Sequence, residues 1–169
     1  GDYYSSNNVI QAETWQHLVL TRNGTTVKGY VNAVEVMVFS NSEDLTSAQV
    51  LAIGYEPGSS SYFNGLIDEV AIWNDDLNSS EVAALYNSGS GLNASTNNGI
   101  YTSSENLQGF WNFNEGAGTT LIDQTNNGNN GTIYGATWND DEALDYYFPT
   151  RLETSSGIIS HHSSLTNTL

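Results

Sequence analysis

The sequence predicts an all-β fold of antiparallel strands with one short helix. Gly and Asn are used heavily and aromatic residues are plentiful, whereas only 13% of the 169 residues are charged, which suits a turn-rich β protein. Short stretches of alternating apolar and polar residues are separated by turn signals along much of the chain. Only one stretch carries both a start and a stop signal of a helix. The length is that of one domain with room for a real core.

The first predicted elements are a hairpin and a third strand, within "HLVLTRNGTTVKGYVNAVEVMVF". Residues 18–23 alternate in polarity, Asn23-Gly24 supplies the positive φ of a tight turn, and residues 27–31 form the return strand. Residues 34–39 form the third strand. Asn32-Ala33 stands between the second and third strands, and because Ala resists positive φ we expect a longer turn or one of a different type there.

The next predicted strands are residues 48–55, "AQVLAIGY", and residues 66–73, which follow the loop "GSSSYFNG". In an unbroken strand at 66–73, Asp68 lies on one face and Glu69 on the other. An acid therefore interrupts each of two otherwise apolar faces, and a buried carboxylate without a partner is costly. These two acids are the most informative charges in the chain.

One helix is predicted at about residues 79–87. Asn78 and Glu81 have the spacing of a capping box, and Gly89 is placed as a stop signal. The following residues, 88–106, are rich in Ser, Gly, Asn and Thr, a composition that predicts a flexible connection.

The last part of the chain returns to strand character and then loses it. From residue 139 onward the pattern thins out, and residues 149–169 are expected to form a loosely ordered tail that includes His161 and His162. The predicted strands are "GFWNF" (109–113), "TTLID" (119–123) and "GTIYGATW" (131–138), with turn signals at Asn127-Gly128 and Asn130-Gly131.

The charge balance excludes several classes of partner. A net charge of −16 argues against binding nucleic acid or inserting into an anionic membrane surface, because both need a basic patch. Arg22, Lys28 and Arg151 are the only fixed cations, so most carboxylates are solvated and attract divalent cations. The absence of Cys excludes disulfides and thiolate metal sites. No apolar run has membrane-spanning length, and the first ten residues do not resemble a signal peptide.

Two parts of the sequence resemble one known family. "WQHLVLTRNGTTVKGYVN", "LAIGY" and "YFNGLIDEVAIWNDDLNSSEVAALYN" resemble the later part of a laminin-G-like domain of the concanavalin-A-like lectin/glucanase superfamily. "FWNFNEGAGTTLIDQTNNGNNGTIYGATW" resembles a segment that usually opens such domains. The resemblance implies a jelly-roll β-sandwich of two antiparallel sheets, and a role in carbohydrate binding or adhesion, often with a bound calcium ion.

The order of these two parts is unusual, because the opening segment comes second. We expect a single sandwich at residues 1–148, closed by the 109–138 segment, which adds to the sheet of 66–73; N-terminal strands are then missing or the pieces are rearranged. The alternative is a second domain cut short. We favour the single domain, because a second one would have too few residues to build its own core.

A divalent cation site is the sharpest hypothesis about chemistry. The resemblance implies a calcium ligand on the strand at 66–73, where Asp68 is the matching position, and Glu115 and Asp123 complete the site if their segment lies alongside. Calcium takes six to eight oxygen ligands, which carboxylates and carbonyls supply. The open alternative is that Asp68 accepts hydrogen bonds from loop backbone and Glu69 is a solvated charge at an edge.

The predicted ligand-binding residues are Tyr55, Tyr62 and Asn64, in or beside the "YEPGSSSYFNG" loop. Aromatic faces stack on sugar rings, and polar groups bind the hydroxyls. The alternative is that Tyr62 and Phe63 close the end of the sandwich. His17 is interpreted as a partly buried structural residue. The four Trp residues, which lie within strand patterns, are predicted to be core: Trp15, Trp73, Trp111 and Trp138.

Catalysis is not expected. Glucanases of the superfamily need carboxylates at alternating positions of one strand, as in E-x-D-x-x-E, whereas Asp68 and Glu69 are adjacent. We therefore expect a non-catalytic extracellular module of a larger secreted or surface protein, which binds a glycan or another cell-surface ligand with the help of calcium. The alternative is a structural spacer or self-associating repeat without a ligand pocket.

Overall fold

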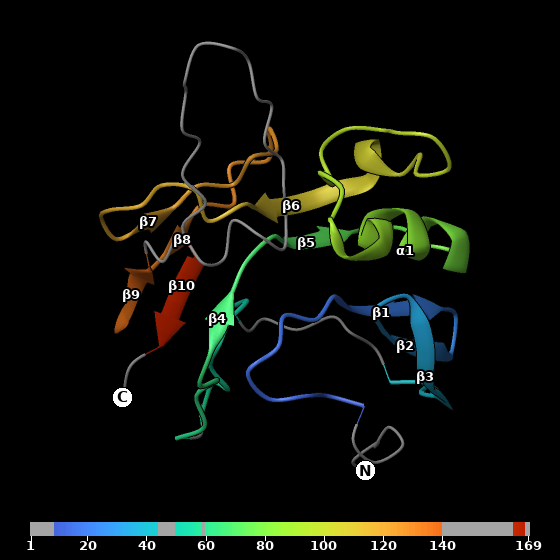
Figure 1. Cartoon of the computed structure of the whole chain (residues 1–169), viewed down its shortest axis with the longest axis horizontal. Helices are drawn as coiled ribbons and strands as arrows, with labels where there is room; N and C mark the ends of the chain where they lie inside the picture. Colours follow the sequence, from blue (N-terminus) through green and yellow to red (C-terminus); the bar gives the residue numbers. More distant parts are fainter. Residues whose placement is uncertain (1–8, 44–49, 59, 140–163, 168–169) are drawn as a thin grey trace. The chain divides into compact units, whose positions relative to one another are not determined.

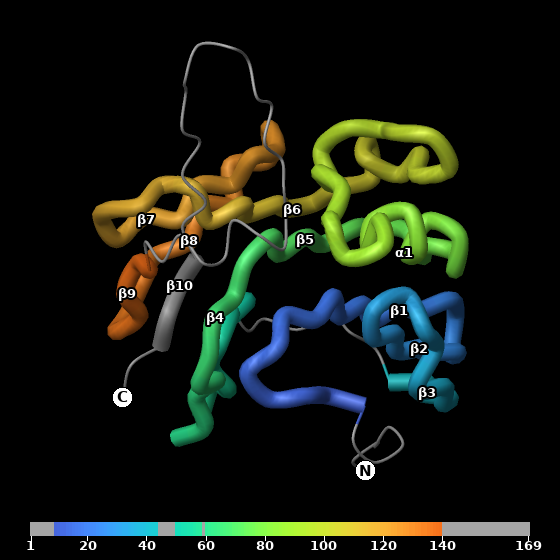
Figure 2. The backbone as a smooth tube through the Cα atoms, in the orientation of Figure 1, coloured from blue at the N-terminus to red at the C-terminus, as the bar shows by residue number. Residues whose placement is uncertain are grey.

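The chain forms two compact units, each assembled from two separate stretches of sequence. The computed structural model describes residues 9–43, 50–58, 60–139 and 164–167 (Figure 1). Unit 1 comprises residues 1–46 and 73–106, and unit 2 comprises residues 47–72 and 107–169. The backbone trace in Figure 2 can be followed through both units; it passes from one to the other three times.

Unit 1 contains an antiparallel sheet in the order β1-β2-β3. Its strands, β1 (Leu18–Asn23), β2 (Thr26–Val31) and β3 (Val34–Ser40), confirm the predicted hairpin and third strand. The first turn is Gly24-Thr25 rather than Asn23-Gly24, because Asn23 still pairs with Thr26. Gly24 has a φ of 57°, and a positive φ at the first central residue is what a two-residue hairpin of this kind requires.

The second turn of this sheet was predicted wrongly. Asn32 and Ala33 form a two-residue loop between paired Val31 and Val34, with φ values of 49° and 66°. Two positive φ angles match the right-handed twist of the flanking strands. Asn32 is also held in place, because its Oδ1 accepts the His17 N–H at 2.9 Å and its own N–H donates to the His17 carbonyl at 2.9 Å. Ala33 consequently adopts a strained conformation.

Replacing Ala33 by Gly is expected to raise the free energy of unfolding by about 0.5–1 kcal/mol. The strain of a residue with a Cβ atom in the left-handed conformation is relieved, and this gain exceeds the cost of the greater backbone entropy of Gly in the unfolded state. Urea unfolding at equilibrium measures this. Gly24→Ala is the matched control, since Gly24 has a φ of 57° and open space around its Cβ position; it should lose stability. A less stable Ala33→Gly protein would contradict the strain argument.

The predicted helix is confirmed as α1 (Ser79–Tyr86). Asn78 accepts the backbone N–H of Glu81 at 3.1 Å, and the Glu81 carboxylate accepts the Asn78 N–H at 3.2 Å, which completes the capping box. The helix ends at Asn87, in the left-handed conformation at φ 47°, and not at Gly89. Asn tolerates this conformation almost as well as Gly.

The stretch 88–106 was predicted as a flexible connection, and this was wrong. Tyr101 is fully buried and accepts the Trp73 indole N–H at 2.9 Å. Ser103 is also buried and donates to Glu81 at 2.6 Å. These contacts hold the low-complexity stretch against α1 and Trp73. It contains two short 3₁₀ turns, η1 (Asn87–Gly89) and η2 (Ser104–Asn106).

Unit 2 is built from short antiparallel strands in three open sheets, with the orders β4-β10-β9, β5-β6 and β7-β8. The antiparallel β class with one short helix is confirmed for the described residues, whereas closure into a jelly-roll sandwich stays a prediction. The strands are β4 (Leu66–Ile67), β5 (Val70–Trp73), β6 (Leu107–Trp111), β7 (Thr120–Leu121), β8 (Gly131–Thr132), β9 (Ala136–Asn139) and β10 (Ser164–Asn167).

Two predicted strands of unit 2 need correction. Of the stretch 48–55, residues 50–54 form no strand, and Val50 is 79% exposed, so its apolar character does not reflect a place in a sheet. The stretch 131–138 is divided into β8 and β9, with Gly135 between them at φ 76°. A left-handed residue changes the chain direction and ends the pairing.

The core of unit 2 is built from the segment that resembles a domain opening. Trp111, Phe113 and Leu121 form a buried cluster. Because β6 pairs with β5, the prediction that this segment joins the sheet of residues 66–73 is confirmed. Trp111 is core as predicted, and Trp15, Trp73 and Trp138 are partly buried. The partly buried residues packed on the cluster are Ile53, Ile67, Val70, Ile133 and Trp138.

The predicted domain bounds of 1–148 stay a prediction. Most of the predicted tail, residues 149–163 and 168–169, lies outside the described residues, as do His161 and His162. Within that range the backbone of residues 164–167 forms β10, which pairs with β4 and β9.

Candidate functional site

The loop that carries the predicted ligand-binding residues is a small hairpin. Tyr55 and Tyr62 form an isolated antiparallel bridge. Backbone hydrogen bonds flank them on both sides, from Phe63 N to Gly54 O at 2.9 Å and from Glu56 N to Ser61 O at 3.1 Å. Directly opposed residues of an antiparallel bridge project from the same face. The loop therefore presents both tyrosine side chains together.

Tyr55 and Tyr62, here called the tyrosine pair, form an exposed aromatic surface. Their rings stack with centroids 5.0 Å apart and planes inclined by 29°. The two side chains are 39% and 46% exposed. The alternative, in which Tyr62 and Phe63 close the end of a sandwich, stays a prediction. Phe63 is 51% exposed and its ring lies against Gly65, where a Cβ atom would approach Phe63 Cε1 to 2.8 Å. Asn64 is exposed beside the pair in sequence.

The predicted strand 66–73 is broken at its two acids. β4 ends at Ile67 and β5 begins at Val70. Between them Glu69 has a φ of 53°, and its N–H donates to Asp68 Oδ1 at 2.9 Å. The break prevents the unbroken arrangement in which one carboxylate would enter each face. Asp68 and Glu69 are called the acid pair below.

The acid pair is half-buried and strongly perturbed. Burial raises the pKa of Asp68 to about 7, against a smaller lowering by the hydrogen bond from the Glu69 N–H. Burial, together with the negative charge of Asp68, raises the pKa of Glu69 to about 8. The expectation that Glu69 is a solvated edge charge is therefore wrong. Two desolvated carboxylates side by side favour either protons or a bound cation.

The acid pair lies at the same end of the β5–β6 ribbon as the residues that follow β6. The two strands run in opposite directions (Figure 1), and a hydrogen bond from Asn74 N to Asn106 O at 3.0 Å closes the other end of the ribbon. The start of β5 therefore neighbours the end of β6. Asn112 comes directly after that end, and Glu115 follows three residues later, beyond a left-handed residue at Phe113 (φ 52°).

Asn112 and Glu115 each carry a buried oxygen that accepts no hydrogen bond. These atoms are Asn112 Oδ1 and Glu115 Oε2, here called the orphan oxygens. Glu115 Oε1, in contrast, accepts the Ile122 N–H at 2.7 Å. Buried oxygens without a donor are rare in native proteins and point to a missing water or ion. Asn112 was not predicted; the one sequence signal is an amide between the aromatic residues Trp111 and Phe113.

The described part of unit 2 contains no Lys, Arg or His that could neutralise these groups. In unit 1, Lys28 is paired with Glu35 at 2.7 Å and Arg22 donates to the Glu43 carbonyl at 2.7 Å. An acceptor-rich site without cations has the ligand chemistry of a hard divalent cation. Among the described residues, however, no three His, Asp or Glu side chains converge as a ligand group, so carbonyls and amides would have to complete the site.

Asp123 is buried and has other partners. Its carboxylate accepts the N–H groups of Phe110 and Thr125 at 3.0 Å each and of Asn129 at 2.9 Å, and the Thr125 hydroxyl at 2.8 Å. Burial by itself would raise its pKa, but the hydrogen bonds from Thr125, Phe110 and Asn129 outweigh burial and lower the pKa. The observed contacts make Asp123 an organiser of the loop after β7.

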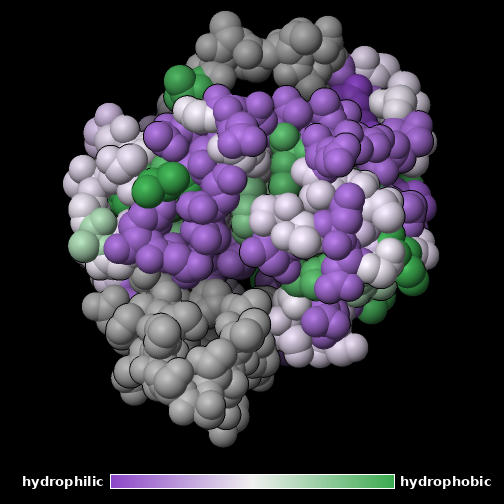
Figure 3. Space-filling model, turned by 90° about the horizontal axis from the view of Figure 1, so that it is seen from above, coloured by the Kyte–Doolittle hydropathy of each residue, from purple (hydrophilic) through white to green (hydrophobic). Residues whose placement is uncertain are grey.

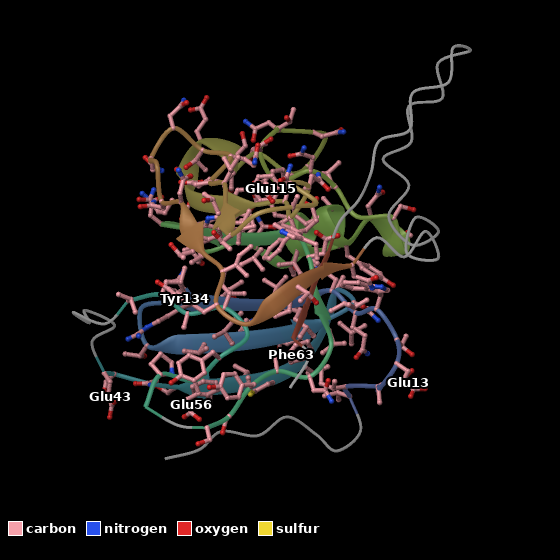
Figure 4. The ribbon with its side chains drawn as sticks, turned by 90° about the vertical axis from the view of Figure 1, so that its left-hand side faces the viewer. Glu13, Glu43, Glu56, Phe63, Glu115 and Tyr134 are labelled. Carbon is pink, nitrogen blue, oxygen red and sulfur yellow. The ribbon has the colours of Figure 1, made fainter. Side chains whose placement is uncertain are left out.

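The aromatic loop and the orphan oxygens are separate places within unit 2. Figure 4 shows Glu56 and Phe63, from the loop, well away from Glu115. The structure thus brings Tyr55 and Tyr62 together, and places Asp68 just before β5, which pairs with the strand that ends four residues before Glu115.

One known protein family matches the first part of the chain. Residues 1–83 match the family model described as concanavalin A-like lectin/glucanases superfamily. This range includes β1 to β5, the tyrosine pair and the acid pair, but not Glu115 or Asp123. Searches of the curated proteins and of the solved structures returned no match. Residues 1–83 of this chain are therefore similar to the concanavalin A-like lectin/glucanases superfamily.

Proposed function

We propose that the chain is a non-catalytic carbohydrate-binding or adhesion module of a secreted or cell-surface protein, with the tyrosine pair as its ligand platform. The observation that carries this proposal is the stacked, exposed pair on a hydrogen-bonded hairpin, with rings 5.0 Å apart. Such rings offer flat apolar faces for stacking on sugars, and the hydroxyl groups and Asn64 add hydrogen bonds. The face drawn in Figure 3 is mostly hydrophilic, as a solvated module requires.

The positions of the described carboxylates support a binding module over a glycosidase. Glycoside hydrolysis needs two carboxyl groups facing each other across one bond. Asp68 and Glu69 are neighbours in sequence, and Asp123 is occupied by backbone donors. No helix in the described part of the chain is long and apolar enough to cross a bilayer. We place the module outside the cell, next to further domains of its parent protein and bound to a glycan.

Tyr62→Ala is expected to weaken glycan binding at least about tenfold, because one stacking face and one hydroxyl are lost, and to change stability by less than about 0.5 kcal/mol. A glycan array identifies the ligand, and titration calorimetry measures the affinity. Tyr134→Ala is the matched control, because Tyr134 is an exposed tyrosine of unit 2 that is 87% exposed and lies outside the loop. Equal binding by the wild type and Tyr62→Ala would remove the loop from the site.

We further propose that calcium binds where the start of β5 meets the end of β6, with the carboxylates of Asp68 and Glu115 as ligands. The orphan oxygens carry this proposal, because a cation would supply the missing partner for both. Glu69 adds negative charge, and Asn112 adds a neutral oxygen ligand. Asp123 belongs to the ligand set predicted from the sequence. It is left out because its carboxylate already accepts hydrogen bonds from four donor groups.

Adding calcium to chelator-treated protein is expected to raise Tm by roughly 5–10 °C, since a ligand at 100 times its Kd stabilises by about 2.7 kcal/mol. Glu115→Gln should abolish most of this rise, because it removes the charge of a ligand. Glu105→Gln, which removes an exposed charge from η2 in unit 1, should leave the rise unchanged. A calcium-dependent rise that survives Glu115→Gln would move the metal elsewhere, and no rise in the wild type would end the calcium proposal.

A structural or self-associating module is the second candidate. Its supporting observation is apolar exposure on the β1–β2–β3 sheet, where Leu18 and Val34 both oppose Val31 and so share one face. Leu18, Leu20 and Val34 are 60%, 67% and 62% exposed. Sedimentation measurements separate the two candidates: association that increases with concentration, together with an empty glycan array, supports the structural module.

A further inference from the structure

The hairpin holds the two phenols of the tyrosine pair as direct neighbours. Tyr55 and Tyr62 oppose each other, and the backbone hydrogen bonds of the hairpin lie on either side of the two residues rather than between them. In an antiparallel ladder, a pair without hydrogen bonds of its own brings the opposed side chains closest together. The ring centroids are 5.0 Å apart, and both rings are exposed to solvent.

Two exposed phenols at this separation are the reactants of oxidative coupling. A one-electron oxidant takes an electron from each phenol, and each hydroxyl proton goes to water, which leaves two phenoxyl radicals. The radicals join through the ring carbons next to the hydroxyl groups, and the hydrogen on each of these carbons moves to the oxygen. One hydrogen peroxide, used by a haem peroxidase, accepts the two electrons and two protons and becomes two waters. The product, dityrosine, is two hydrogen atoms lighter than the two tyrosines.

We infer that Tyr55 and Tyr62 are a site of covalent cross-linking, at which an oxidant of the peroxidase class joins the two rings as dityrosine. Groups held together on one hairpin meet at an effective concentration in the millimolar range or above, which exceeds that of separate protein molecules at micromolar concentration. The sequence contains no Cys, so no thiol of the chain consumes the radicals first. The cross-link needs neither a glycan nor calcium, and it therefore goes beyond the proposed function.

The other tyrosines require that the product be located within the chain. Among the described residues, Tyr55 and Tyr62 are the two tyrosines whose rings stack on each other, whereas Tyr134 is exposed without a ring contact. A protease that cuts before aspartate releases residues 44–67, in which the tyrosine pair accounts for both tyrosines. Four further tyrosines lie outside the described residues and outside this peptide: Tyr3, Tyr4, Tyr146 and Tyr147.

The test exposes wild-type protein at micromolar concentration to a haem peroxidase and limiting hydrogen peroxide. The monomer is isolated by size exclusion and digested, and the 44–67 peptide is examined by mass spectrometry and dityrosine fluorescence. We expect a fluorescent peptide that is two hydrogen atoms lighter, in at least about tenfold higher yield than from Tyr62→Phe. Tyr62→Phe keeps the ring and removes the phenolic hydrogen that coupling needs. A circular dichroism spectrum equal to that of the wild type verifies that the variant folds.

Tyr134→Phe is the matched control, because it removes an exposed phenol that has no tyrosine neighbour among the described residues, and it should leave the yield of the cross-linked peptide unchanged. A 44–67 peptide of unaltered mass in the wild type, under conditions that couple free tyrosine, would overturn the inference. Cross-linking through this peptide that occurs only in covalent dimers would also overturn it, because the bond would then join separate molecules. The same holds for a fluorescent, lighter peptide that persists in Tyr62→Phe.

Discussion

Asp123→Ala is expected to lower the free energy of unfolding by about 3–4 kcal/mol, the largest effect among the substitutions considered. The change leaves three backbone N–H groups, of Phe110, Thr125 and Asn129, without their acceptor. Asn129 also accepts the indole N–H of Trp111 at 2.9 Å, so the loss extends to the buried cluster of unit 2. Urea unfolding monitored by Trp fluorescence measures the effect.

The measurement should be repeated in calcium and in chelator, because Asp123 was predicted from sequence as a metal ligand. A structural Asp123 gives the same loss in both conditions, whereas a ligand gives a larger loss in calcium. Asp76→Ala is the matched control. Asp76 is exposed and accepts one side-chain hydrogen bond, from Asn23 at 2.8 Å, so its removal should cost less than about 0.5 kcal/mol. A small effect of Asp123→Ala in both conditions would contradict the role assigned here.

In chelator, the free energy of unfolding is expected to fall by as much as about 6 kcal/mol between about pH 5 and about pH 9 because of the acid pair. The folded-state pKa values of Asp68 and Glu69, about 7 and about 8, lie above their ordinary values of 3.8 and 4.5. The folded state therefore holds these protons more tightly than the unfolded state does. The stabilisation is complete below the ordinary pKa values and is lost as the pH rises through 7 and 8.

Urea midpoints across this pH range, each in chelator and in calcium, provide the test. Calcium should flatten the profile, since a bound cation replaces the protons as the partner of the carboxylates. The double variant Asp68→Asn, Glu69→Gln should give a flat profile in chelator and exceed the wild type in stability at high pH. Asp123 acts in the opposite direction, because its lowered pKa makes its contribution disappear as the pH falls. A wild-type profile that is flat in chelator would contradict the burial of the acid pair.

The parts of the fold that depend on neighbours in sequence were predictable. The capping box of Asn78 and Glu81 lies within one helical turn, so its spacing alone identifies the start of α1. The β1–β2 hairpin is similarly local. The pairing of β6 with β5 was also predicted, but only because the resemblance to a known family joined two distant segments.

Long-range contacts explain most of the errors. Tyr101 and Ser103 lie in a low-complexity stretch, and nothing nearby in sequence shows that Trp73 will bind the hydroxyl of Tyr101 or that Glu81 will bind that of Ser103. Ala33 accepts a strained φ because the strands on both sides select the turn, which overrides the preference of one residue. At such positions the conformation that the local sequence prefers differs from the one that long-range contacts require, and the long-range contacts determine the structure.

The candidate sites also include residues that could be predicted from the sequence and residues that could not. Tyr55 and Tyr62 were predicted from residue type and loop position, and their stacking needed only a short hairpin. Asn112 was missed because an isolated amide between aromatic residues has no pattern. Its significance depends on an oxygen left without a donor, which only atomic packing reveals.

The interleaving of the two units has a consequence for how the chain acquires its structure. Unit 1 needs residues 73–106 as well as its first stretch, and unit 2 needs residues from 107 onward as well as 47–72. During synthesis from the N-terminus, the hairpin of unit 1 can form early, but residues 47–72 must wait for partners that emerge much later. A single cut in the chain cannot separate the two units and leave both of them complete. Fragments made for binding studies should therefore keep the whole interleaved region, because a shorter piece exposes strands whose partners have been removed.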